Sequence, residues 1–380
     1  MNSVQILDQL IGFPTVSRDS NLALIEFVRH FLATRGVESK LYMDRDGRKA
    51  NLYASIGPAD RGGVLLSGHT DVVPTDGQRW TSSPFRLQER GGRLFARGAA
   101  DMKGFIACAL RAADRATARP LWLPLQLAFS YDEEVGCLGV RSLIDDMAEW
   151  AHRPRFCIVG EPTLLRTAVG HKGKTALKAT CHGRAAHSAA PGHGINAIHM
   201  ASDLIERIRR RQSSIELSGP CDPAYDVPNT TLHVGVIHGG SALNIVPARC
   251  ELEFEIRNLP QDDPAALLAA IRADATAVAD SMHGDADTRI DLDLMYEYPG
   301  LETPADAEVV ELAAALTGNR ERIKVAFGSE GGLFSARLGI PTVVCGPGSI
   351  DQAHKPDEYV AIDQLQRCDA MMDALLDRLA

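Results

Sequence analysis

Paired cysteines, long apolar runs and a basic, apolar N-terminus are all missing from this sequence. Its eight cysteines are scattered and none belongs to a Cys-x-x-Cys pair, which argues against a disulfide framework and a zinc knuckle. No apolar run approaches the roughly 18 residues that a membrane span needs. The opening segment 1–5 shows no basic region leading into an apolar core, so no secretory signal is visible. We therefore predict a cytoplasmic protein with reduced thiols and no membrane partner.

An excess of positive charge is missing as well. The formal net charge is -9 at pH 7, which argues against nucleic acid or an anionic membrane as a general partner. The composition is otherwise that of an ordinary globular protein, with 45% hydrophobic and 23% charged residues. Because domains average roughly 150 residues, a chain of 380 residues predicts about two of them.

A histidine and an aspartate follow the short apolar run 64–66, which we predict to be a buried strand. His69 is a candidate metal ligand. Asp71 lies two residues further along an extended chain, so it points the same way and would orient the imidazole. Ligands bind at the carboxyl ends of strands in open α/β sheets. Taken alone, however, a His-x-Asp pair at a strand end is more often structural than functional.

Three further stretches place acidic residues at the ends of predicted elements. Asp101 precedes an apolar helix predicted over 105–118, where an N-cap is the alternative role. The acids 132–134 follow a strand predicted at 125–129; adjacent acids repel unless cations offset them, and a solvated loop is the alternative. Glu161 follows another apolar strand. Acids or a histidine at the ends of several predicted elements are much less expected by chance than at the end of one.

The pattern changes after Gly173. Strand and helix periodicities then follow one another in β-α-β-β-α-β order, the last strand being predicted at 288–295. This order predicts a compact α+β module inserted into a larger α/β domain. We place the inserted domain at 174–283 and the larger, catalytic domain at 1–173 and 284–380.

The chain-wide set of acids and imidazoles suits a metal centre. It consists of His69, Asp101, Glu133, Glu134, Glu161 and His354. Such nitrogen and oxygen donors suit zinc, cobalt or manganese without a thiolate. Five of them would serve two ions if one carboxylate bridges the pair, and the remaining acid would then be free to act as a general base.

These motifs resemble the M20 family of cocatalytic zinc peptidases and deacylases. The matching motifs are His69-x-Asp71, Asp101-Met102-Lys103-Gly104, Asp132-Glu133-Glu134, Gly160-Glu161-Pro162 and His354, and they extend over essentially the whole chain. The acetylornithine deacetylase branch is the most similar, through 328–330 and 353–359, and succinyl-diaminopimelate desuccinylases share much of the rest. The resemblance implies a zinc-peptidase-like α/β catalytic domain with a central mixed sheet flanked by helices. It also implies that the insert is a ferredoxin-like dimerisation or lid domain.

The resemblance assigns the metal ligands. His69, Asp101 and Glu161 would hold one divalent ion, with Asp101 bridging to a second ion completed by Glu134 and His354. The two ions would be Zn²⁺, with Co²⁺ as the alternative.

It also assigns the groups around the ligands. Asp71 would orient His69, and Glu133 would be the general base. The family often has a cis peptide after the bridging aspartate, here between Asp101 and Met102. Glu161 stands where the family's aminopeptidases have aspartate, which favours removal of an acyl group.

Four further residues match substrate or lid positions. His187 matches a histidine that reaches the active site of a partner subunit and stabilises the oxyanion. The alternative is that His187 is a surface residue without a catalytic role. Asn244 and Arg257 match substrate-binding positions; Arg257 would clamp an α-carboxylate or, equally, form a surface salt bridge. Glu330 would pair with the side-chain ammonium of the substrate. A homodimer through the inserted domain follows from the same resemblance.

The implied activity is removal of acetate from N²-acetyl-L-ornithine, a step of arginine biosynthesis. Another N-acyl amino acid is the alternative substrate: succinyl-diaminopimelate, acetylcitrulline or a general acyl amino acid. Ser329, where the branch commonly has threonine, and the following Gly331-Gly332 are departures that bear on this choice. A non-catalytic metal-binding or ligand-binding relative is disfavoured because the ligands and Glu133 are all present.

Overall fold

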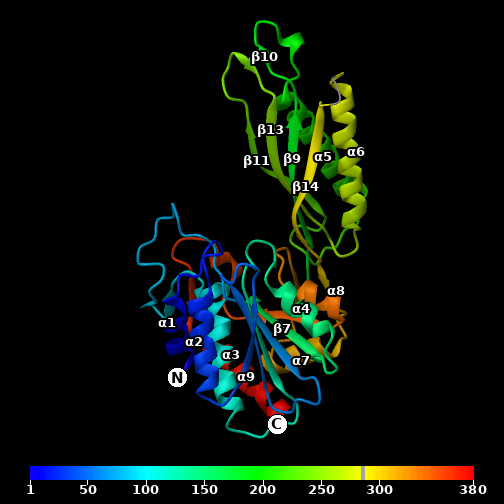
Figure 1. Cartoon of the computed structure of the whole chain (residues 1–380). Helices are drawn as coiled ribbons and strands as arrows, with labels where there is room; N and C mark the ends of the chain where they lie inside the picture. Colours follow the sequence, from blue (N-terminus) through cyan, green and yellow to red (C-terminus); the bar gives the residue numbers. More distant parts are fainter. Residues whose placement is uncertain (284–286) are drawn as a thin grey trace. The chain divides into compact units, whose positions relative to one another are not determined.

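The computed structural model describes residues 1–283 and 287–380. The chain divides into two compact units. Unit 1 consists of Met1–His171 and Leu301–Ala380, and unit 2 consists of Lys172–Gly300. Figure 1 shows both units, with unit 2 in green and yellow.

Unit 1 is built on a mixed sheet with the strand order β1-β2-β6-β3-β7-β17-β8-β15, in which β16 also pairs with β8. Its strands are β1 (Ser39–Met43), β2 (Ala50–Ile56), β3 (Val64–His69), β6 (Leu125–Ser130), β7 (Phe156–Pro162), β8 (Thr167–His171), β15 (Leu301–Glu302), β16 (Arg322–Val325) and β17 (Thr342–Gly346). Every residue of β3 and β6 is buried, as expected for central strands covered on both faces. The apolar runs of the sequence therefore lie at the centre of the sheet.

Helices cover this sheet (Figure 1). They are α1 (Ser3–Ile11), α2 (Leu22–Ala33), α3 (Gly104–Ala116), α4 (Val140–Ala148), α7 (Glu308–Thr317), α8 (Gly331–Leu338) and α9 (Ile362–Leu379). The largely buried α3 packs against α1, α2 and α9, while α4 packs against α8. A smaller sheet in the order β18-β5-β4 joins β4 (Gln88–Arg90), β5 (Arg93–Phe95) and β18 (Tyr359–Ala361). The short turns η1 (Ala99–Lys103) and η3 (Ile350–Gln352) precede α3 and β18.

Unit 2 has an antiparallel sheet in the order β11-β13-β9-β14. Its elements are β9 (Lys174–His182), β10 (Ala186–His187), η2 (Pro191–His193), α5 (Ala197–Ser218), β11 (Thr231–Gly239), β12 (Ile245–Val246), β13 (Arg249–Arg257), α6 (Pro264–Ser281) and β14 (Arg289–Tyr298). Alternate residues of the sheet share one apolar core with α5 and α6. Side-chain caps from Asn196 and Asp263 begin the two helices. The main elements follow the predicted β-α-β-β-α-β order.

The C-terminal boundary of the insert lies later than predicted. We placed it after residue 283, but β14 pairs with β9 along its whole length, so unit 2 extends to Gly300. Residues 284–286, with which the second catalytic segment was predicted to begin, lie outside the described residues. Gly331 and Gly332, which depart from the pattern of the branch, begin α8.

The cysteines are free thiols, and Cys221 is the exposed one among them. Within residues 1–283 and 287–380, no helix combines the length and apolarity needed to span a membrane.

Candidate metal centre

Several strand ends converge on one edge of the unit 1 sheet. Strand β3 runs parallel to β6 and to β7, and β7 runs parallel to β17, so the carboxyl ends of these strands meet at the same edge. The residues on or after these ends are His69 of β3, Glu133 and Glu134 after β6, Glu161 of β7 and His354 after β17. Asp101 lies in the adjoining turn η1.

The aspartate lies between the two imidazoles. Nε2 of His69 is 3.0 Å from Oδ1 of Asp101 and 3.8 Å from Oε1 of Glu161. Nε2 of His354 is 3.2 Å from Oδ2 of Asp101 and 3.0 Å from Oε2 of Glu134. Each oxygen of Asp101 thus faces one imidazole, which is the arrangement that a bridging carboxylate requires. The peptide bond between Asp101 and Met102 is cis.

Two groups of side chains have the spacing of metal ligands. His69, Glu133 and Glu161 form one group, and His69, Asp101 and Glu134 form the other, with ligand atoms within 4.8 Å of one another in each. Nitrogen and carboxylate oxygen are donors that zinc and similar divalent ions accept. The donor set therefore fits a dinuclear centre. Distance alone also places Glu133 among the ligands, so its separate role as a base rests on the family resemblance.

Asp71 lies against the His69 imidazole, and its main-chain oxygen is nearer to the ring than its carboxylate is. Nδ1 of His69 is 2.9 Å from the main-chain oxygen of Asp71, against 3.6 Å from its carboxylate. A carbonyl oxygen only accepts, so Nδ1 carries the proton and Nε2 is left to face the acids. The Asp71 carboxylate instead accepts hydrogen bonds from Ser17 Oγ (2.7 Å) and from the backbone N–H groups of Glu133 (3.1 Å) and Glu134 (3.3 Å).

Two supporting residues, Ser17 and Lys49, were not found from sequence. Nζ of Lys49 is 2.6 Å from Oδ1 of Asp132 and also donates to the main-chain oxygen of Ser17. These contacts fix the backbone of the acidic segment. Their sequence separation leaves no local pattern that would have revealed them.

The protonation equilibria show how strongly the site favours positive charge. Burial raises the pKa of Glu161 to about 8, and burial together with the charge of Asp101 raises the pKa of Glu134 to about 7. Hydrogen bonds to Asp101 and Glu134 raise the pKa of His354 to about 10. Burial opposes ionisation of Asp101, but its hydrogen bonds to His354 and His69 hold its pKa well below the usual range. The raised pKa values of Glu134, Glu161 and His354 mean that this cluster favours added positive charge, which a bound divalent cation would supply.

Comparison with known proteins identifies the fold and the family. The family model described as "Peptidase family M20/M25/M40" matches residues 65–378. The chain belongs to this family. An acetylornithine deacetylase from Myxococcus xanthus is 37% identical over 374 residues, covering 96% of this chain and 94% of the relative. One from Proteus mirabilis is 34% identical and covers 98% and 96%. The resemblance predicted from the motifs is confirmed.

Solved structures of M20 proteins share the fold. The metallo-carboxypeptidase Sso-CP2 of Sulfolobus solfataricus aligns with a TM-score of 0.78 at 19% identity, covering 99% of this chain and 98% of that one. The YxeP protein of Bacillus subtilis, titled a dinuclear metal-binding peptidase of the M20 family, aligns with a TM-score of 0.69 at 16% identity, covering 99% and 97%. The predicted fold class is confirmed.

Other predicted groups of this M20 protein are buried in unit 1. Glu330 is 1% exposed, accepts a hydrogen bond from Ser67 Oγ at 3.1 Å, and has its pKa raised to about 7 by burial. Its carboxylate is therefore closed to solvent here. Lys103 donates from Nζ to the main-chain oxygens of Leu10 and Phe13, at 3.2 and 2.8 Å. It links η1 to the end of α1, and among the described residues no direct contact joins its ammonium to the acids of the metal centre.

The predicted residues of unit 2 fall into two places. His187 and Asn244 are both exposed and lie together, because Ser188 N donates to Asn244 O at 3.1 Å. Arg257 is the last residue of β13. The first residue of β13, Arg249, pairs with His182 at the end of β9, and His182 lies five residues before His187. Nine residues of strand cover roughly 26 Å at about 3.3 Å per residue, so Arg257 lies at the opposite end of the sheet. Its guanidinium pairs with Glu255 at 2.9 Å, the alternative that the sequence left open.

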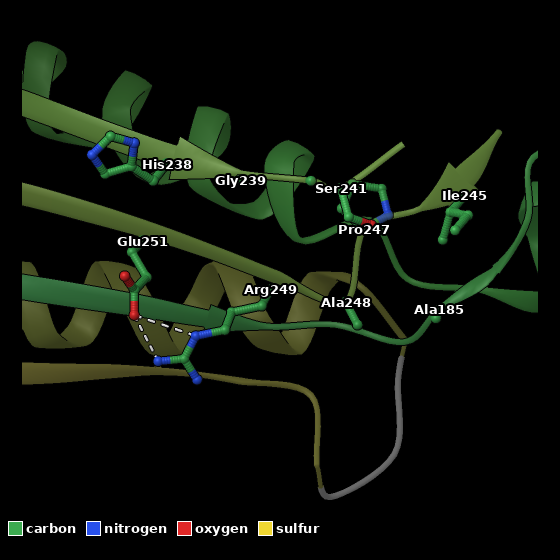
Figure 2. Close-up of a pocket in the computed structure, with 10 residues that line it drawn as sticks. Ala185, His238, Gly239, Ser241, Ile245, Pro247, Ala248, Arg249 and Glu251 are labelled. Carbon is green, nitrogen blue, oxygen red and sulfur yellow. Dashed lines mark hydrogen bonds and ion pairs between the residues drawn. The ribbon is translucent and has the colours of Figure 1, made fainter. Parts of the chain in front are cut away.

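A shallow cavity of about 420 Å³ lies in unit 2 (Figure 2). Its lining includes His238, Ser241, Ile245 and the ion pair Arg249–Glu251. Strand β12, which contributes Ile245, pairs with the β10 strand that carries His187. The exposed His187 loop thus borders a hollow surface. The acids of the metal centre are not part of its lining.

Proposed function

We propose that this chain hydrolyses the acetyl amide of N²-acetyl-L-ornithine, releasing L-ornithine and acetate in arginine biosynthesis. The observation that carries the proposal is identity of 33–37% to acetylornithine deacetylases over nearly the full length of both chains. A metal-dependent amidohydrolase is also what the acid and imidazole cluster suits chemically. The free thiols are consistent with a cytoplasmic enzyme.

We propose that the ligands are shared between two ions. His69 and Glu161 would bind one zinc ion, Glu134 and His354 the other, and Asp101 would bridge them. The two carboxylate oxygens of Asp101 face different imidazoles, which supports this sharing of ligands between two ions. Ions bound there would polarise the scissile carbonyl and lower the pKa of a water molecule.

Glu133 is proposed as the general base. Its carboxylate would take a proton from the attacking water and later deliver that proton to the leaving α-amine of ornithine. In the metal-free chain, burial together with the charge of Glu161 raises the pKa of Glu133 well above its usual value. The Asp71 carboxylate supports the transfer by fixing the backbone of Glu133.

His187 is proposed to act across a homodimer and to donate to the oxyanion of the partner's substrate. Strand β11 lies at the edge of the unit 2 sheet, and its Val236 and Ile237 are 36% and 50% exposed. An exposed edge strand of this kind is a ready template for pairing with a second copy. Sedimentation at micromolar concentration tests the dimer: a purely monomeric mass removes it, and the role of His187 in trans with it.

Substrate choice is tested by comparing kcat/KM for four acyl amino acids on the zinc-reconstituted protein. We would use N²-acetylornithine, acetylcitrulline, acetylmethionine and succinyl-diaminopimelate. The proposal predicts the highest value for acetylornithine. A higher value for another of the four would keep the chemistry and replace the substrate.

A further inference from the structure

A buried ion pair lies beside the metal centre without belonging to it. Arg97 and Glu358 are each 1% exposed, and Nη1 of Arg97 is 2.6 Å from Oε2 of Glu358. Removing two charges from water is costly, and the attraction between them offsets that cost only when further hydrogen bonds satisfy both groups. The further hydrogen bonds of this pair go to the two segments that carry Asp101 and His354.

The Glu358 carboxylate binds the backbone of the Asp101 turn. Its Oε1 accepts from the N–H groups of Ala100 (2.9 Å) and Asp101 (3.1 Å), and its Oε2 accepts from Gly98 N (3.0 Å). The turn needs such a partner, because Gly98 is left-handed at φ +81 and Asp101 departs from helical geometry at φ -121, ψ 92. One side chain thereby satisfies three N–H groups next to the proposed bridging ligand.

Arg97 and Gln78 bind the segment of His354. Nη1 of Arg97 reaches the main-chain oxygen of Lys355 at 3.4 Å, and its Nη2 donates to Oε1 of Gln78 at 2.7 Å. Nε2 of Gln78 in turn donates to the main-chain oxygen of His354 at 3.1 Å. His354 has φ +62, which is uncommon for a residue other than glycine and needs support from its surroundings.

We propose that Glu358, Arg97 and Gln78 are positioning residues that set the distance between Asp101 and His354. The two ligands come from segments about 250 residues apart, yet Nε2 of His354 lies 3.2 Å from Oδ2 of Asp101. The network joins the main chains of both segments and touches neither ligand side chain. Loss of outer groups of this kind weakens metal binding by about 10–100-fold. The inference rests on the proposed metal centre and names residues outside it.

The test measures cobalt binding to metal-free protein, by calorimetry and by the visible absorption of Co²⁺, alongside thermal unfolding without metal. Gln78→Ala removes a half-buried contact to the His354 segment and leaves one N–H of the buried Arg97 without its acceptor, so we expect a lower melting temperature and about tenfold weaker binding of one ion. Glu358→Gln replaces an acceptor oxygen with a donor, so we expect a lower melting temperature and 10–100-fold weaker binding. In both variants the absorption of the weakened ion should change.

Asp114→Asn is the matched control. Asp114 pairs with Arg35 at 2.6 Å in unit 1, with side chains 35% and 21% exposed, and has no contact with either ligand segment among the residues described. We expect this variant to lose stability while keeping its cobalt affinity. The inference is overturned if wild type binds two ions and both Gln78→Ala and Glu358→Gln bind them equally tightly. It is also overturned if Asp114→Asn loses as much affinity as they do. Failure of wild type to bind cobalt would instead refute the metal centre itself, and this inference with it.

Discussion

In unit 1 the candidate ligands are held from several sides, whereas in unit 2 the candidates His187 and Asn244 are exposed. Asp101 lies between two imidazoles and its backbone is bound by Glu358. His187 is exposed, and its ring accepts one hydrogen bond from the neighbouring Ala189 N. The acids of unit 1 are therefore preorganised within one chain. The action of His187 on the substrate of a partner subunit stays a prediction.

Glu133→Gln, in unit 1, should have the largest effect on activity. It removes the proposed proton carrier and leaves the surrounding hydrogen bonds in place. We expect kcat to fall by about 10²–10⁴-fold, with both metal ions retained. Steady-state kinetics and metal analysis check this. Asp132→Asn is the neighbouring control, since it breaks the ion pair with Lys49 and should lower stability more than kcat. Equal losses of kcat in both variants would contradict the role of Glu133 as the general base.

The second prediction concerns His187 of unit 2. His187→Ala should lower kcat by about 10²–10³-fold, as loss of an oxyanion donor does, without changing metal content or the melting temperature. His193→Ala, in the same exposed loop, should have wild-type kcat. If His187→Ala lowered stability and left kcat intact, its role would be structural.

Sequence alone predicts that the acids and imidazoles of unit 1 lie together, because their position depends on local pattern; their assignment as metal ligands stays a prediction. His69 and Glu161 follow apolar runs after one or two intervening residues, and parallel pairing of those runs brings their ends together. The contact of Ser17 with Asp71 joins residues 54 positions apart, and no periodicity marks it. The boundary placed at 283 left out the strand at 288–295, although the predicted β-α-β-β-α-β order includes that strand, and in the structure it is β14 and pairs with β9.

A third prediction concerns Glu330, which is buried in unit 1 although it was predicted to meet the substrate. If it pairs with the ornithine ammonium, Glu330→Gln should lower the preference for acetylornithine over acetylmethionine by about tenfold. Ratios of kcat/KM measure this. An unchanged ratio would make Glu330 a structural acid.

The smallest effect is on the stability of the metal-free protein. The raised pKa values of Glu161 and Glu134, about 8 and 7, mean that the folded chain keeps protons that the unfolded chain releases above about pH 4.5. The raised pKa of His354, about 10, acts in the same direction above about pH 6.5. Stability should thus fall between pH 5 and pH 8, lowering the melting temperature by several degrees. Added zinc should stabilise more at pH 8, since bound ligands are deprotonated. A melting temperature that rises over this range without metal would contradict the charge balance described for unit 1.

The most direct test of the central claim is acetate release from N²-acetylornithine by metal-stripped protein during stepwise addition of zinc or cobalt. The account predicts no turnover without metal, and activity that rises with added ion to saturation at two equivalents per chain. Turnover that is complete in the metal-free protein, or absent at every metal concentration, would contradict it.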